Sequence, residues 1–149
     1  MSKHSKILIV DDELNIRRIL QMAFEKVGHE VSVAEDAYSA LGLLESQNFD
    51  LVITDVTMPG MNGYELQKVV HEKQPDIPVI IMTAYGTIPQ AVAAIRNGAF
   101  EYITKPFDLD QLKKIAASAL DGALTPSKSK KKGGKLEMGE IRSLLLVLR

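Results

Sequence analysis

The fold that we expect for this chain of 149 residues is decided by residues 50–55, which read Asp-Leu-Val-Ile-Thr-Asp. A short aliphatic run without a polar face is typical of a strand buried inside a parallel sheet, and this run stops at the carboxylate of Asp55. The segment Lys6–Val10 has the same character and stops at Asp11 and Asp12. Both segments therefore predict buried strands whose carboxyl ends carry acidic side chains.

Strand and helix signals alternate along most of the chain. Apolar residues recur at helical spacing between the aliphatic runs, Gly28 and Gly98 end two helical stretches, and we expect Gly60 and Gly63 to be turn residues with positive φ. We predict strands at 6–10, 30–34, 51–54, 78–82 and 100–104, and helices at 14–27, 37–46, 63–72, 88–97 and 109–120. The helix caps that we expect are Asp36, Asn62, Thr87 and Asp108. Five strand–helix units with short links predict a doubly wound parallel sheet with helices on both faces.

Polar residues mark the carboxyl ends of four predicted strands, where open α/β sheets collect their functional groups. They are Asp11 and Asp12, Asp55, Thr83 and Lys105. Three carboxylates at one edge repel one another and stay ionised only beside a cation. Because these ligands are all oxygen atoms, we expect a hard ion, and Mg²⁺ is the usual one where phosphate is handled.

The same residues favour phosphoryl chemistry. Lys105 suits the oxygens of an incoming phosphoryl group as a point charge, and the Thr83 hydroxyl can hydrogen-bond that group. Asp55 is the candidate nucleophile, since a carboxylate can form an aspartyl-phosphate. Taken singly, each residue has an ordinary structural explanation, such as a helix cap or a strand-end hydroxyl. The combination carries the prediction.

Four motifs resemble the response-regulator receiver domain of bacterial two-component signalling, in the family's order and spacing. They are ILIVDDE (residues 7–13), DLVITDVTMPGMNG (50–63), MTAYG (82–86) and GAFEYITKPF (98–107), and the resemblance covers about residues 5–121. The last motif is most similar to receivers of sigma-54-dependent transcription activators. The resemblance implies a flavodoxin-like α/β fold with five parallel strands in the order 2-1-3-4-5.

The resemblance also implies a role for each matching residue. Asp55 would accept a phosphoryl group from the phosphohistidine of a histidine kinase. Lys105 would contact the phosphoryl oxygens, and its bond to Pro106 would be cis. The implied Mg²⁺ ligands are Asp11, Asp12, Asp55 and the backbone carbonyl of Thr57.

The implied output is a conformational switch rather than turnover of a substrate. Thr83 would move to the phosphoryl group and Tyr102 would swing inward behind it. The face formed by the fourth helix, fifth strand and fifth helix would then change and control an output protein or domain in transcription regulation. We expect no separate enzyme activity beyond assistance to its own phosphotransfer and autodephosphorylation, and we expect a phosphorylation-dependent dimer as one form of output.

Composition indicates the compartment in which we expect this protein. The chain has no cysteine, which fits a reducing compartment, and no apolar run approaches the roughly 18 residues of a membrane span. The aliphatic run at Ile7–Val10 is too short for the core of a signal peptide. We therefore expect a cytoplasmic protein that does not bind membranes, and we expect no direct nucleic-acid binding by residues 1–122.

Charge and composition divide the chain into unequal parts. From Thr125 onward seven basic and two acidic residues give +5, so the preceding part carries −6 of the total of −1. We predict a receiver domain at residues 1–122, a basic flexible linker at 123–135 and a short apolar tail at 136–149. The tail is a short helix, an appended sequence or the start of a longer natural chain.

Two other functions compete with the receiver interpretation. A flavin- or nucleotide-binding module on the same fold would present backbone N–H groups to phosphate after the first strand. Here that loop holds Asp11, Asp12 and Glu13, which repel phosphate. A metal-dependent phosphatase that uses Asp55 is the other alternative, but Thr57 stands where a second acid would be needed.

Overall fold

The computed structural model describes residues 4–122, which form five strands that alternate with five helices. The strands are β1 (Lys6–Val10), β2 (Glu30–Ala34), β3 (Leu51–Asp55), β4 (Val79–Thr83) and β5 (Glu101–Thr104). The helices are α1 (Leu14–Lys26), α2 (Ala37–Ser46), α3 (Gly63–Lys73), α4 (Ile88–Arg96) and α5 (Leu109–Gly122). The predicted linker at 123–135 and tail at 136–149 lie outside the described residues.

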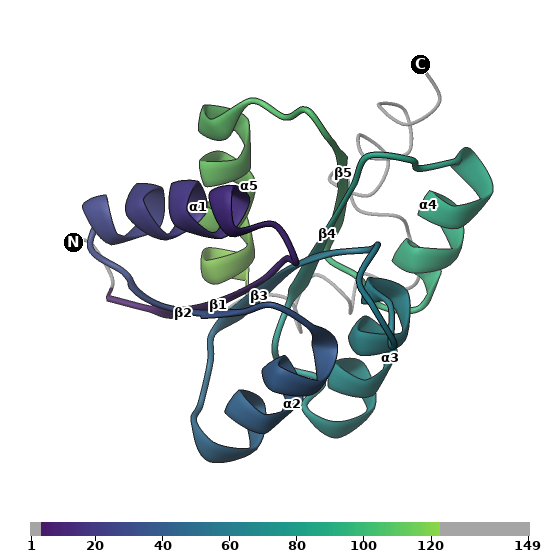
Figure 1. Cartoon of the computed structure of the whole chain (residues 1–149), viewed down its shortest axis with the longest axis horizontal. Coiled ribbons are helices and arrows are strands. Elements are labelled where there is room, and N and C mark those ends of the chain that lie inside the picture. Colours follow the sequence, from purple (N-terminus) through teal and green to yellow (C-terminus); the bar gives the residue numbers. More distant parts are fainter. Residues whose placement is uncertain (1–3, 123–149) are drawn as a thin grey trace.

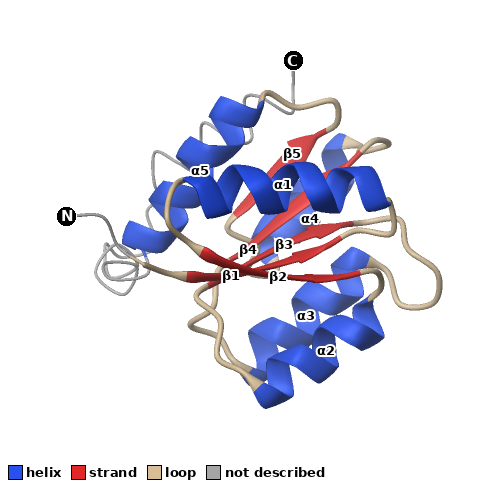
Figure 2. Cartoon of the chain, turned by 60° about the vertical axis from the view of Figure 1, so that its left-hand side comes forward, coloured by secondary structure: helices blue, strands red, loops and turns tan. Residues whose placement is uncertain are grey.

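The five strands form one parallel sheet in the order β2-β1-β3-β4-β5, which confirms the expected flavodoxin-like topology. Helices α1 and α5 cover one face of the sheet, and α2, α3 and α4 cover the other (Figures 1 and 2). Chain order reverses at β1 and β3, whose carboxyl ends lie side by side at the switch point where such sheets carry their sites.

Two hydrophobic cores lie on opposite faces of the sheet, because successive side chains of a strand point in opposite directions. In β1, Leu8 and Val10 pack with residues of α2, α3 and α4, whereas Ile7 and Ile9 pack with Leu20 and other residues of α1 and α5. This division explains why the central strands are aliphatic at every position.

Side-chain caps place the helix starts where the sequence predicts them. Asn62 and Glu65 form a reciprocal capping box at α3, in which each side chain accepts from the other residue's backbone N–H, at 2.9 and 2.8 Å. The other three predicted caps also accept a backbone N–H, and they are Asp36, Thr87 and Asp108. Each cap therefore fixes where the loop that follows the preceding strand ends.

Strands β3 and β4 each run one residue further than the sequence predicts, and the extra residues are Asp55 and Thr83. Asp55 is paired with Met82, and Thr83 is paired with Thr104. Both candidate site residues therefore project from the sheet rather than from the loops beyond it. The remaining helix and strand ends either coincide with the prediction or differ from it by one or two residues, as ends commonly do.

Gly63 is a correction to the sequence analysis. The backbone has positive φ at Gly28, Gly60 and Gly98, but not at Gly63. Gly63 is instead the first residue of α3, and a Cβ atom there would collide with the backbone carbonyl oxygen of Asp55. The glycine is therefore needed for close approach of the helix to the end of β3, not for an unusual backbone conformation.

Among residues 4–122, no helix has both the length and the apolar character needed to cross a bilayer.

Candidate functional site

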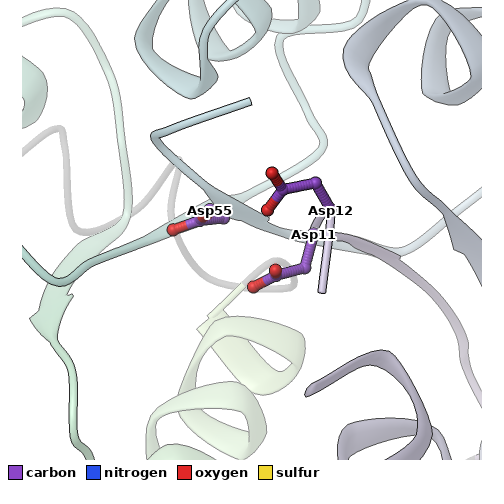
Figure 3. A group of neighbouring side chains, drawn as sticks. All are labelled: Asp11, Asp12 and Asp55. Carbon is purple, nitrogen blue, oxygen red and sulfur yellow. The ribbon is translucent and has the colours of Figure 1, made fainter. Parts of the chain in front are cut away.

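Three carboxylates gather at the carboxyl ends of β1 and β3, as Figure 3 shows. Val10 pairs with Thr54 in the sheet, so the residues that follow them, Asp11 and Asp55, lie next to each other. One carboxylate oxygen from each of Asp11, Asp12 and Asp55 lies within 4.8 Å of the others. The sheet register thus brings together residues that are more than forty positions apart in the chain.

Asp11 is fully buried and is held on several sides. Its backbone N–H donates to the carbonyl of Ala34 at 3.1 Å, and its Oδ1 accepts the backbone N–H of Glu13 at 2.9 Å. Asp12 is exposed and points its carboxylate toward the same centre. The group therefore combines two buried carboxylates, Asp11 and Asp55, with the exposed carboxylate of Asp12.

Lys105 joins the carboxylates from the end of β5. Its Nζ lies 3.0 Å from Asp11 Oδ2, 3.3 Å from Asp55 Oδ1 and 3.6 Å from Glu13 Oε1. Burial alone would lower the pKa of Lys105, but the hydrogen bonds and charges of Asp11 and Asp55 outweigh it and raise that pKa. Lys105 therefore stays charged, and its bond to Pro106 is cis, as the resemblance implies.

The Asp55 carboxyl group has an unusual affinity for protons. Burial, and next the negative charge of Asp11, raise the pKa of Asp55 to about 6. Lys105 and the backbone N–H of Val56 oppose this increase without cancelling it. The single ammonium group of Lys105 therefore does not neutralise the negative charge of the carboxylates around it.

A hard divalent cation fits this donor set. The carboxylates of Asp11, Asp12 and Asp55 supply oxygen ligands only, and their charge exceeds that of Lys105. Such a set favours Mg²⁺ over metals that prefer nitrogen or sulfur. A metal site of this kind is what the resemblance to receivers implies.

Thr83 is buried at the end of β4, one residue after Met82, which pairs with Asp55. Its Oγ1 accepts the backbone N–H of Tyr85 at 3.1 Å, and its backbone carbonyl accepts the N–H of Lys105 at 2.8 Å. Thr57 is exposed in the segment that follows β3, and a metal-binding role for its carbonyl stays a prediction.

Tyr102 is buried, with 5% of its surface exposed. Its hydroxyl oxygen lies 2.8 Å from the hydroxyl oxygen of Tyr64 on α3, and the two rings are stacked at 6.3 Å between centroids. Sequence reasoning missed Tyr64, as well as the ion pair between Glu13 and Lys105. Glu13 ends the first motif and Tyr64 follows the second, but only the packing of distant segments reveals the two contacts.

Residues 7–117 match the response regulator receiver domain family, and this match covers well over half of the chain. The chain belongs to this family. A receiver is a phosphoacceptor rather than a conventional enzyme, which argues against the phosphatase and nucleotide-binding alternatives.

Individual relatives refine this assignment. AtoC of Escherichia coli (strain K12) is 44% identical over 120 residues, which are 80% of this chain and 26% of AtoC. FleR of Pseudomonas aeruginosa is 39% identical over 123 residues, which are 83% of this chain and 26% of FleR. This receiver is thus similar to those of sigma-54-dependent activators, and it spans about a quarter of the length of these relatives.

A solved structure agrees with this assignment. The beryllofluoride-activated NtrC4 receiver domain dimer has a TM-score of 0.76 to this receiver at 30% identity. The match covers 79% of this chain and 98% of that chain.

Proposed function

We propose that this receiver is a signalling switch in which Asp55 accepts a phosphoryl group from a histidine kinase. The observation that carries the proposal is the position of Lys105 Nζ, which lies within 3.3 Å of both Asp11 and Asp55 beside a cluster of three carboxylates. A carboxylate close to a positive charge, beside oxygen ligands that could hold a hard cation, supports this chemistry. Phosphoryl transfer depends mainly on such positioning and charge stabilisation.

The transfer step follows from these groups. A carboxylate oxygen of Asp55 attacks the phosphorus of the kinase phosphohistidine, a phosphorus–oxygen bond forms, and the phosphorus–nitrogen bond breaks. The bonding electrons return to the imidazole of the kinase, which takes up a proton. Lys105 balances the negative charge on the transferring phosphoryl oxygens.

We propose Mg²⁺ as the cation, held by Asp11, Asp12, Asp55 and the backbone carbonyl of Thr57. When bound, it supplies positive charge that neutralises the carboxylates and the phosphoryl oxygens. The chain's own residues hold the carboxylates in position. Asp11 is fixed by its backbone and side-chain hydrogen bonds, and Asp55 is held by its pairing with Met82 in the sheet.

The switch begins at Thr83. Phosphorylation adds a charge of about −1.5 to −2 and three acceptor oxygens. The Thr83 hydroxyl accepts from Tyr85 N–H in the structure, and its own proton is free to be donated to a phosphoryl oxygen once the loop moves. Movement of Thr83 shifts the segment between β4 and α4, and so biases the face of α4, β5 and α5, with Tyr102 beneath it.

The output that we propose is control of transcription through an output protein or domain. AtoC and FleR are, by name, a regulatory protein and a response regulator, and both are longer than this chain. The NtrC4 receiver, activated by beryllofluoride, is a dimer, so we propose a phosphorylation-dependent dimer here. Residues 1–122 act through protein contacts, without binding nucleic acid or membranes, and like most receivers this one works in the cytoplasm.

Residues 1–122 are the receiver in this proposal. Residues 123–135 would be a basic flexible linker, and residues 136–149 a short apolar tail. The charge difference between the acidic part and the basic part of the chain supports this division.

Intact mass after incubation with acetyl phosphate and Mg²⁺ tests the proposal. The wild-type protein should gain the mass of one phosphoryl group, and the Asp55→Ala variant should gain none. Asp76→Ala, which removes an exposed carboxylate far from the cluster in sequence, is the matched control and should behave as wild type. An equal gain in wild type and Asp55→Ala would exclude Asp55 as the acceptor.

A further inference from the structure

We propose that Tyr64 is a positioning residue, which holds Tyr102 inside the domain and thereby favours the arrangement of the β4–α4 segment that binds the phosphoryl group. This inference rests on the proposed function of Asp55 and concerns the regulation of the same site. It is carried by one hydrogen bond, one ring contact and one close approach at a glycine.

The first observation is the pair of phenol groups. The hydroxyl oxygens of Tyr64 and Tyr102 are 2.8 Å apart, and the rings are nearly parallel, with an interplanar angle of 25°. Tyr102 projects from β5, where it pairs with Ile81, and Tyr64 is the second residue of α3. The contact therefore joins an edge strand of the sheet to the helix that begins just after the phosphoacceptor strand.

The hydroxyl proton that this pair needs is always present. Burial, and next the hydrogen bond with Tyr102, raise the pKa of Tyr64 above the ordinary range of tyrosine. Tyr64 is therefore a neutral phenol under all conditions in which the domain works. The two hydroxyl groups satisfy each other at a place where Tyr102 has little contact with water.

The second observation links Tyr102 to Thr83. A Cβ atom on Gly86 would collide with the Tyr102 hydroxyl, and it would lie 2.9 Å from the Thr83 methyl carbon. The Tyr102 hydroxyl, the Gly86 backbone and the Thr83 methyl group therefore meet at one point. Whatever moves the Tyr102 hydroxyl also changes the space that is open to the segment between β4 and α4.

These contacts make Tyr64 a determinant of the switch equilibrium. Without the Tyr64 hydroxyl, the Tyr102 hydroxyl is buried with one partner fewer, and rotation toward water restores its hydrogen bonding. When the Tyr102 ring leaves the interior, the space behind Thr83 opens. Binding of the phosphoryl group must then also supply the free energy that returns the ring to its inward position. A binding-competent state that is less populated lowers the apparent affinity in proportion.

Beryllofluoride in the presence of Mg²⁺ is the probe for this inference, and its binding to the full chain is followed by NMR titration. Tyr64→Phe should weaken the apparent affinity by up to about fivefold, the factor by which losing one ordinary hydrogen bond shifts the inward–outward equilibrium of Tyr102. In a Tyr102→Phe background the same substitution should have no effect, because no hydroxyl remains for Tyr64 to hold. Tyr38→Phe removes the hydroxyl of an exposed tyrosine on α2 and should bind as wild type.

A second measurement needs neither the metal nor the probe. In the unliganded wild-type protein, proton contacts between the Tyr102 ring and Gly86 should be seen by NMR, and Tyr64→Phe should weaken them. The inference is wrong if the Tyr64→Phe variant binds beryllofluoride as tightly as the wild-type protein. It is also wrong if Tyr64→Phe weakens binding by the same factor in the Tyr102→Phe background as in the wild-type background. Failure of the wild-type protein itself to bind beryllofluoride would instead overturn the proposed function.

Discussion

Lys105 Nζ lies 3.3 Å from Asp55 Oδ1, although the two residues are separated by fifty positions in the chain. Lys105 is also only 3.0 Å from Asp11, so its single charge is shared between two buried carboxylates. The Asp55 carboxylate is thus partly neutralised before any phosphoryl group or metal arrives. This shared charge makes the site responsive to pH, to cations and to loss of the ammonium group.

Lys105→Met should slow phosphorylation of Asp55 by acetyl phosphate at least tenfold. The substitution removes the positive charge that faces the transferring oxygens, and loss of one such group commonly costs factors of about 100 to 1,000. The rate is measured by intact mass over time. Lys114→Met, at an exposed position of α5, is the control, and an equal rate in both variants would contradict this role of Lys105.

The stability of the metal-free protein should depend on the ionisation of Asp55. Its pKa is about 6 in the folded protein and near 3.8 without the fold, so the folded state binds the proton more tightly. The contribution of Asp55 to stability is therefore greatest below about pH 4 and is lost as the pH rises through about 6. Ionised Asp55 then destabilises the fold at neutral pH.

Asp55→Asn should consequently stabilise the metal-free protein by about 2 kcal/mol at pH 7.5, and much less at pH 4.5. Thermal or urea unfolding in the presence of EDTA at the two pH values measures this difference. A stabilisation of the same size at both pH values would show that ionisation of Asp55 is not its cause.

Mg²⁺ should bind more weakly as the pH falls below about 6. Protons and the cation compete for the Asp55 carboxylate, because its pKa is raised to about 6 by burial and by Asp11. The dissociation constant should increase by up to about tenfold per pH unit below that value. Calorimetric titration at several pH values measures it, and Asp55→Asn should bind weakly with little pH dependence.

Gly63→Ala should destabilise the domain by about 2 kcal/mol or more. The added Cβ would strike the backbone carbonyl of Asp55, so α3 and the end of β3 must separate. Gly42→Ala is the matched control, because nothing lies within 4 Å of a Cβ at that position inside α2. It should stabilise the protein by about 0.5–1 kcal/mol, as alanine does within a helix. Urea unfolding of both variants checks the two opposite signs.

The acidic cluster was predictable because it depends on strand ends. Aliphatic runs mark the strands at Lys6–Val10 and Leu51–Asp55, and a parallel sheet brings their carboxyl ends to one edge. The polar residues that follow each run then have to converge, whatever the details of packing. The nearness of Asp11, Asp12, Asp55 and Lys105 follows from that rule.

The reason for Gly63 was not predictable in this way. A turn-like sequence suggests positive φ, but the distance between the start of α3 and the carbonyl of Asp55 depends on how closely a helix packs on the sheet. Local sequence carries no measure of that distance, since it arises from side chains across the whole core.

The amino-acid sequence by itself determined the order of strands and helices, the helix caps and the residues at the carboxyl edge, because periodicity and capping are local properties of the chain. Only the tertiary structure decided that Asp11 is buried, that Lys105 divides its charge between Asp11 and Asp55, and that Tyr64 meets Tyr102. These contacts join segments 38 to 94 positions apart, and their geometry depends on packing distances that no single segment contains.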